Sequence, residues 1–150
     1  TKFLGTICQR QSRTRTALPT ATMNHTQTGA WAEDLAWQHM HQRGWNLVAR
    51  NFFCKGGELD IVAYKRGILA FVEVKYRRSQ AMGGAIASLS LRKQLHLIHS
   101  AKVFLQRYPR LSQLDCRFDL IAISGPAPSE HGSANQVQIQ WLDNAFITSG

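Results

Sequence analysis

Two short segments place carboxylates and a lysine within otherwise apolar stretches of the chain. Residues 57–63 read GELDIVA, and residues 71–75 read FVEVK. Because side chains alternate between the faces of a strand, Glu58 and Asp60 should share one face, and Glu73 and Lys75 should share another. Charges within an apolar strand cost several kcal/mol unless they are paired, hydrated or bound to a metal ion. The pattern therefore predicts a compensating partner for these charges.

The two segments are expected on neighbouring strands. Asp60 precedes Glu73 by 13 positions across a turn, so an antiparallel pair would bring the two carboxylates together. Like charges at close range repel, which raises a pKa unless a cation lies between them. Ligation by oxygen alone favours Mg²⁺ or Mn²⁺, and the backbone carbonyl of Val74 is a further candidate ligand. The simpler alternative is a surface salt bridge between Glu73 and Lys75.

A metal site of this kind would suit phosphodiester hydrolysis. A divalent ion held by Asp60 and Glu73 would polarise a phosphodiester oxygen and lower the pKa of a bound water. Lys75, one strand step further on the same face, would position that water or neutralise charge in the transition state.

The surrounding pattern predicts the elements that must hold these residues. Apolar periodicity and turn residues indicate the order α-β-β-β-α-β-β, and short links favour an antiparallel meander for the first three strands. The predicted helices are Gly29–Arg43 and Leu91–Tyr108, and the predicted strands are Trp45–Phe52, Glu58–Tyr64, Ile68–Tyr76, Cys116–Ser124 and a last strand that includes residues 136–141.

Three finer expectations concern these elements. Thr28 is the expected N-cap of the first helix. Three apolar residues are expected on one face of the second strand: Leu59, Ile61 and Ala63. The stripe expected to be buried on the long helix consists of Leu91, Leu95, Ile98, Ala101 and Leu105.

Length, composition and charge limit the class of protein. The 150 residues fit one domain, and 44% hydrophobic with 18% charged residues exclude a low-complexity or wholly disordered chain. Residues 1–22 carry four basic residues and no acid, so we expect a basic, disordered extension before a single domain of residues 23–150. The net charge of +9 falls to +5 without that extension (14 basic against 9 acidic residues), which still indicates a polyanionic partner such as nucleic acid.

The sequence indicates neither a membrane span nor a disulfide framework. No apolar run approaches the ~20 residues that span a bilayer. Cys8, Cys54 and Cys116 form no CxxC motif, so we expect reduced thiols in a cytoplasmic protein.

The ordered set of motifs resembles the D…(D/E)xK signature of the PD-(D/E)xK nuclease superfamily. More closely, the chain is similar to the YraN family, proteins predicted to be endonucleases distantly related to archaeal Holliday junction resolvases. The resemblance extends from about Gly29 to Phe146 and is carried by Glu33, GELD at 57–60, FVEVK at 71–75 followed by Arg77, Lys93 with Ala101, Arg117-Phe118-Asp119, and Asn144-Ala145-Phe146. One departure is Phe52-Phe53, near which the family often carries a basic residue.

The resemblance implies a fold and an activity. The fold would have the α-β-β-β-α-β core that is typical of restriction endonucleases. It would be an α/β (α+β) domain with a mixed sheet, and an additional strand would follow at the C-terminal end. The activity would be that of a Mg²⁺-dependent (or Mn²⁺-dependent) DNA endonuclease that hydrolyses phosphodiester bonds, with branched DNA as a candidate substrate. Resolvase-like enzymes also imply a homodimer, because two strands must be cut symmetrically.

The resemblance also implies roles for individual residues. Asp60 and Glu73 would be metal ligands, and Lys75 would be the catalytic lysine. Glu33 would be an acid that the first helix adds to the metal site. The residues themselves leave a second interpretation of Glu33, a first-turn acid that favours the helix dipole. Glu58 would assist as an outer or alternative ligand, or would only solvate the start of its strand.

Other interpretations stay open at this point. Four basic residues would line a groove for phosphates or form a solvated edge: Arg77, Arg78, Arg92 and Lys93. Arg117 and Asp119 are expected to form a structural ion pair, and the four tryptophans are expected in the core rather than stacked on bases. A catalytically silent nucleic-acid-binding or protein-interaction module is the alternative to a nuclease, and RNA is an alternative substrate.

Overall fold

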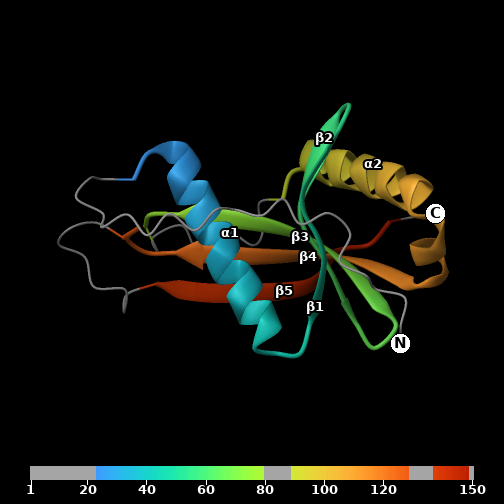
Figure 1. Ribbon diagram of the computed structural model, residues 1–150. Coiled ribbons are helices and arrows are strands. Elements are labelled where there is room, and N and C mark those ends of the chain that lie inside the picture. Colours follow the sequence, from blue (N-terminus) through green and yellow to red (C-terminus); the bar gives the residue numbers. More distant parts are fainter. Residues whose placement is uncertain (1–22, 80–88, 129–136, 149–150) are drawn as a thin grey trace.

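A five-stranded mixed sheet and two α-helices make up the part of the chain that the computed structural model describes, residues 23–79, 89–128 and 137–148. The predicted fold class and element order are confirmed (Figure 1). The expected disordered extension of residues 1–22 lies outside the described residues. In chain order the elements are α1 (His25–His41), β1 (Asn46–Cys54), β2 (Gly57–Lys65), β3 (Ile68–Arg77), α2 (Leu91–Arg107), the 3₁₀-helix η1 (Pro109–Gln113), β4 (Asp115–Ser124) and β5 (Gln138–Phe146).

The strands lie in the sheet in the order of the sequence, β1-β2-β3-β4-β5. The first three form the predicted antiparallel meander, and Arg66 and Gly67 make the β2–β3 turn with φ of 46° and 82°. β3 and β4 pair in parallel and are joined by a crossover through α2, the kind of connection that neighbouring parallel strands need, and β5 returns antiparallel to β4. β3 is therefore a central strand, and the segment that carries Glu73 and Lys75 pairs with β4.

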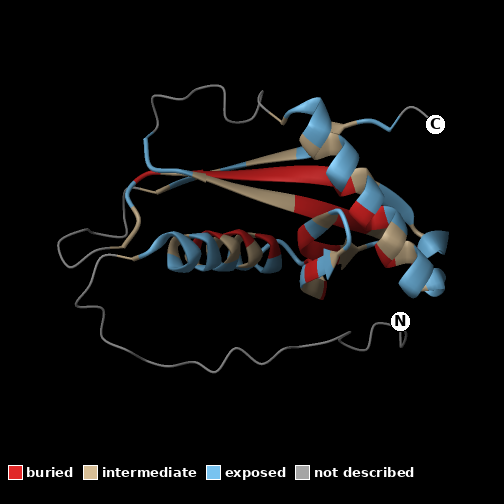
Figure 2. Cartoon of the chain, turned by 90° about the horizontal axis from the view of Figure 1, so that it is seen from above, coloured by how far each residue is buried: buried red, intermediate tan, exposed pale blue. Residues whose placement is uncertain are grey.

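The two helices cover opposite faces of the sheet. Ala32, Ala36 and Met40 of α1 pack with one set of strand residues, which includes Ala70 and Val72. α2 packs on the other face with a set that includes Leu69, Phe71 and Val62. In Figure 2 the buried residues lie in the middle of the sheet and on the sheet-facing sides of the helices. Successive residues of β3 thus point alternately toward α1 and α2, which gives Glu73 and Lys75 the α2 side.

The buried stripe of α2 differs from the prediction. Leu91 and Leu95 are 70% and 56% exposed, whereas Leu97 and Phe104 are buried. The helix is rotated so that Lys93, Leu97 and Ala101, each four positions apart, face the sheet. The physical reason is that the first turn of α2 lies over charged groups of β3, as the Lys93–Glu73 ion pair shows, and an apolar side chain would gain nothing there.

The start of α1 also differs from the prediction, because the helix begins four residues earlier than expected. Asn24, not Thr28, is the N-cap. Its side chain accepts a hydrogen bond from the backbone N–H of Gln27 at 2.9 Å, and the Gln27 side chain accepts one from the Asn24 N–H at the same distance. This reciprocal capping box satisfies two backbone donors that the end of a helix would otherwise leave without partners.

The sheet divides at Asp60, where β2 leaves β3. Backbone pairing between these strands ends at Ile61 and Val72, whereas β2 stays paired with β1 as far as Gly57. Leu59 consequently packs on the α2 side and Ile61 on the α1 side, so the expectation that they share a face is wrong. We call this division between β2 and β3 the fork.

The free end of the β1–β2 hairpin packs against α2 (Figure 1). His99 of α2 lies with its Nε2 2.8 Å from the carbonyl oxygen of Lys55. Gly57 approaches the helix so closely that a Cβ atom there would clash with Ser100 Oγ and lie 3.2 Å from the carbonyl oxygen of His96. Asn51, on β1 beside the fork, has a φ of 50°, an uncommon value for a residue other than glycine. The hairpin is therefore bent at the fork and held there by α2.

Candidate functional site

Asp60 takes the place of a backbone partner at the fork. Its Oδ2 accepts a hydrogen bond of 2.9 Å from the backbone N–H of Val74, which has lost its neighbour on β2. The side chain is buried, and burial raises the pKa of Asp60 above its ordinary 3.8. Because a strand residue presents its N–H and its C=O at the same edge, we expect the Val74 carbonyl to face the fork as well.

Glu73 lies beside Asp60, as the meander predicts. The two carboxyl groups are close enough to interact as hydrogen-bonding side chains, and burial, followed by the Asp60 charge, raises the pKa of Glu73 from 4.5 to about 8. Glu73 Oε1 lies 3.1 Å from Nζ of Lys93, whereas Oε2 is buried and no donor in the described part of the chain reaches it. One oxygen of Glu73 is thus paired with a lysine, and the other has no hydrogen-bond donor among the described residues.

Glu33 approaches the same place from α1. It lies in the middle of α1, so the alternative of a first-turn acid is wrong. Burial is the largest cause that raises the pKa of Glu33 to about 7, and the charge of Asp60 is the next. The guanidinium of Arg50 lies 3.5 Å from Glu33 and opposes that rise. Because the sheet is divided at the fork, Glu33 on the α1 side can interact electrostatically with Asp60, although Asp60 lies beside Glu73 and Lys93 on the α2 side.

Lysines accompany the acids on the α2 side. Lys75 shares the face of Glu73, and burial, followed by the Arg77 charge, lowers the pKa of Lys75. Lys93 and Glu73 also act on Lys75 electrostatically, in opposite directions. The structure therefore brings together four of the predicted site residues, Asp60, Glu73, Lys75 and Lys93.

The remaining predicted residues lie at the margin of this cluster. Glu58 is exposed, yet its charge raises the pKa of both Asp60 and Glu33. Arg77, Arg78 and Arg92 are exposed, the first two at the end of β3 and the third at the start of α2. Their positions on the surface are compatible with either contacts to phosphates or a solvated edge.

The fit of a metal ion is mixed. In residues 23–79, 89–128 and 137–148, no three His, Cys, Asp or Glu side chains form a group that could hold an ion, so these side chains supply at most two carboxylates to a metal site at the fork. The oxygens of Asp60 and Glu73 nevertheless suit a hard cation, because the two carboxyl groups adjoin and Glu73 Oε2 is buried with no hydrogen-bond donor in the part of the chain that the structure describes. Asp60, Glu73 and the Val74 carbonyl could hold Mg²⁺ or Mn²⁺ with water in the remaining positions.

Sequence reasoning missed two residues of the site on β1. Arg50 pairs with Glu33 and also lies 2.7 Å from Asp34, which connects β1 to α1. Asn51 interacts with the side chain of Glu33 through a hydrogen bond that lowers the pKa of the latter. The sequence does contain an indication of these two residues, because the charged Arg50 and the amide Asn51 interrupt the apolar strand just before Phe52.

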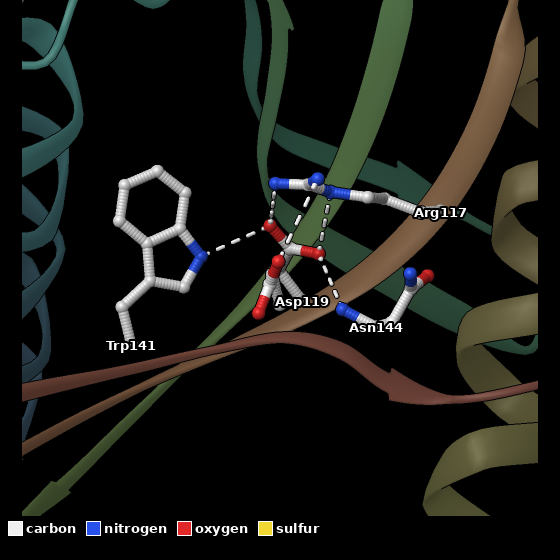
Figure 3. Close-up of polar contacts among 5 residues, drawn as sticks. Arg117, Asp119, Trp141 and Asn144 are labelled. Atoms are coloured by element: carbon white, nitrogen blue, oxygen red, sulfur yellow. Dashed lines mark hydrogen bonds and ion pairs between the residues drawn. The ribbon is translucent and has the colours of Figure 1, made fainter.

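A second buried polar group lies away from the fork, between β4 and β5 (Figure 3). Asp119 accepts hydrogen bonds from Trp141 Nε1 at 2.9 Å and from the backbone N–H of Asn144 at 3.1 Å, and Arg117 pairs with both of its oxygens. Arg117 also lies over the ring of Trp45 at 5.1 Å. The predicted structural ion pair is confirmed, and these tryptophans belong to the packing of the sheet, as expected.

The fold and the site define a mixed α/β protein in which buried acids and lysines meet at a fork in the sheet. The chain belongs to the uncharacterised protein family UPF0102, whose model matches residues 32–123. It is similar to UPF0102 proteins of Pseudomonas entomophila (46% identity, 79% of this chain and 91% of the relative) and of Saccharophagus degradans (41% identity, 81% and 94%). The expected family is thus confirmed at the level of this YraN-like group. Among the described residues, no helix has the length and apolar character needed to cross a membrane.

Proposed function

We propose that the chain is a Mg²⁺- or Mn²⁺-dependent endonuclease of the PD-(D/E)xK class that hydrolyses phosphodiester bonds in DNA. The observation that carries the proposal is the meeting of the Asp60 and Glu73 carboxylates beside Lys75. The charge of Asp60 adds to burial in raising the pKa of Glu73, and a divalent cation is the partner that would make the proximity of the two acids favourable.

The residues at the fork would have separate roles in metal binding and in the hydrolysis of the phosphodiester. Asp60, Glu73 and the Val74 carbonyl would hold the ion, which supplies electrophilic activation of the phosphodiester and acidifies a bound water. Lys75 would hold the attacking water or balance charge on the phosphorane-like transition state. Its lowered pKa suits proton transfer, because a group is most effective when its pKa approaches the working pH.

The charge of the chain supports a nucleic-acid substrate. Lys and Arg exceed Asp and Glu by nine. Exposed basic residues flank the fork at the end of β3 and the start of α2, where they would contact phosphates: Arg77, Arg78 and Arg92. Branched DNA and a homodimer that cuts it symmetrically form the finer part of the proposal, and they rest on the resemblance to resolvases.

The test is cleavage of linear, nicked and branched DNA by the purified chain in Mg²⁺ or Mn²⁺. Asp60→Asn, Glu73→Gln and Lys75→Met should each reduce the rate by a factor of about 10² or more. Asp143→Asn, at an acid that is 69% exposed on β5, is the matched control and should cleave like the wild type. Cleavage that survives all three substitutions at the fork would show that the reaction occurs elsewhere.

A second candidate is a nucleic-acid-binding module without catalysis. The ion pairs Lys93–Glu73 and Arg50–Glu33 favour it, because they neutralise acids at the fork without a metal ion. Calorimetric titration of Mn²⁺ into the wild type and Asp60→Ala separates the two candidates. Salt-dependent DNA binding with no Mn²⁺ uptake by either protein would support the binding module.

A further inference from the structure

Lys93 lies where a divalent cation would have to act. Its Nζ is 3.1 Å from Glu73 Oε1, and the Glu73 side chain is only 12% exposed. Lys93 also influences Asp60, since its charge opposes the rise in the pKa of that acid. A single lysine thus balances both acids of the proposed metal pair, although it comes from a different element, α2.

Two cations at Glu73 would repel each other. A divalent ion bound to either oxygen of Glu73 would lie within a few ångströms of Lys93 Nζ, in a place where burial weakens screening. Lys75 adds a further positive charge that already senses Lys93. Binding of the ion is therefore opposed as long as Lys93 stays on Glu73.

The side chain of Lys93 is also able to move away from Glu73. Its side chain is 33% exposed, and it belongs to the first turn of α2, where Ser90 Oγ accepts a hydrogen bond from its backbone N–H. A lysine side chain is long and flexible, so its ammonium can move while the capped helix stays in place. Arg92, the preceding residue, is exposed, and the two basic groups together would attract a phosphate.

We propose that Lys93 is a positioning residue that competes with the divalent cation for Glu73 until a phosphodiester draws it away. The proposal rests on the metal-dependent function proposed above, and it adds the order in which nucleic acid and the cation bind. Without nucleic acid, Lys93 keeps the affinity for the cation low. With nucleic acid, Lys93 moves to a phosphate, and Glu73 becomes available to the cation. Metal uptake and substrate binding are then coupled, and each must strengthen the other by the same factor.

The test is calorimetric titration of Mn²⁺ into the full chain, with and without a phosphorothioate oligonucleotide that resists cleavage. For the wild type, the oligonucleotide should strengthen Mn²⁺ binding about tenfold, the factor that corresponds to ~1.4 kcal/mol. Lys93→Met should bind Mn²⁺ about tenfold more tightly than the wild type in the absence of the oligonucleotide, and the oligonucleotide should then add little. Lys93→Arg keeps the charge and should behave more like the wild type.

Lys102→Met is the matched control, at an exposed lysine on the same helix, and should titrate like the wild type. Circular dichroism of each variant checks that the fold is retained. If Lys93→Met binds Mn²⁺ no more tightly than the wild type while Asp60→Asn abolishes uptake, the competition is refuted and the metal site stands. If neither the wild type nor Lys93→Met takes up Mn²⁺ under any condition, both this inference and the metal-dependent function fail.

Discussion

Replacement of Glu73 by glutamine should stabilise the protein at pH 8 in metal-free buffer. Burial, and next the Asp60 charge, raise the pKa of Glu73 from 4.5 to about 8. A carboxyl group whose pKa rises on folding holds its proton more tightly in the folded state. The contribution of Glu73 to the stability of the wild type is therefore fully present below about pH 4.5 and is lost as the pH rises toward about 8. The distance between the two pKa values sets an upper limit of about 5 kcal/mol for this loss.

The pKa of about 8 already includes the attraction of Lys93, which lies 3.1 Å away and lowers it, so the loss of this ion pair is not subtracted again. The net gain should still be smaller than the limit, because the amide of glutamine is an imperfect substitute for a protonated carboxyl group, and a buried polar group without a partner costs about 1–3 kcal/mol. We therefore expect Glu73→Gln to gain about 2 kcal/mol in the free energy of unfolding at pH 8. At pH 4, where Glu73 is mostly protonated in both the folded and the unfolded wild type, the variant should gain almost nothing.

Urea unfolding at pH 4, 6 and 8 in the presence of EDTA measures this difference, with the fluorescence of the four tryptophans as the signal. Asp143→Asn is the control, since this exposed acid should leave both the stability and its pH dependence unchanged within ~0.5 kcal/mol. A Glu73→Gln variant that is less stable than the wild type at pH 8, or that differs by the same amount at every pH, would refute the reasoning.

Three further substitutions test the packing around the site. Asp119→Ala should cost at least ~3 kcal/mol in urea unfolding, because it leaves the partly buried guanidinium of Arg117 without its carboxylate; a loss below ~1 kcal/mol would contradict the structural role of this group. Gly57→Ala should cost about 1–3 kcal/mol, because the new methyl group meets Ser100, and unchanged stability would mean that the hairpin does not touch α2. Gly29→Ala, in the open on α1, should instead raise the melting temperature by contributing ~0.5–1 kcal/mol, and a decrease would argue against a helix at that position.

The strands could be predicted from the sequence because their signals are local. Alternation and turn residues predict β2 and β3 within one residue at each end, and the short turn at Arg66 and Gly67 forces them to be antiparallel neighbours. That neighbour relation alone is enough to bring Asp60 and Glu73 together. The central pair of the candidate site therefore follows from a hairpin, the simplest non-local structure that a sequence can indicate.

The partners of those acids could not be predicted in the same way. Lys93 reaches Glu73 from α2, and Arg50 reaches Glu33 from β1, across sequence separations that carry no periodic signal. The fork itself also depends on tertiary packing, since Leu59 turns toward α2 only because the hairpin leaves β3 and docks on that helix. The alternation of apolar and polar residues along a strand depends only on neighbouring positions, so it does not indicate that Leu59 changes to the other face of the sheet.

The order of the strands along the chain has a consequence for how the protein folds. The meander that carries Asp60 and Glu73 involves only contacts between residues close in sequence, so it can assemble early and rapidly. α2 follows it in the chain and precedes β4, which pairs with β3. During synthesis the two acids would first meet while water still surrounds them, and their burial would begin only when α2 arrives with Lys93. Lys93, which neutralises Glu73, and the surface of α2, which excludes water, would thus reach the two acids in the same folding step.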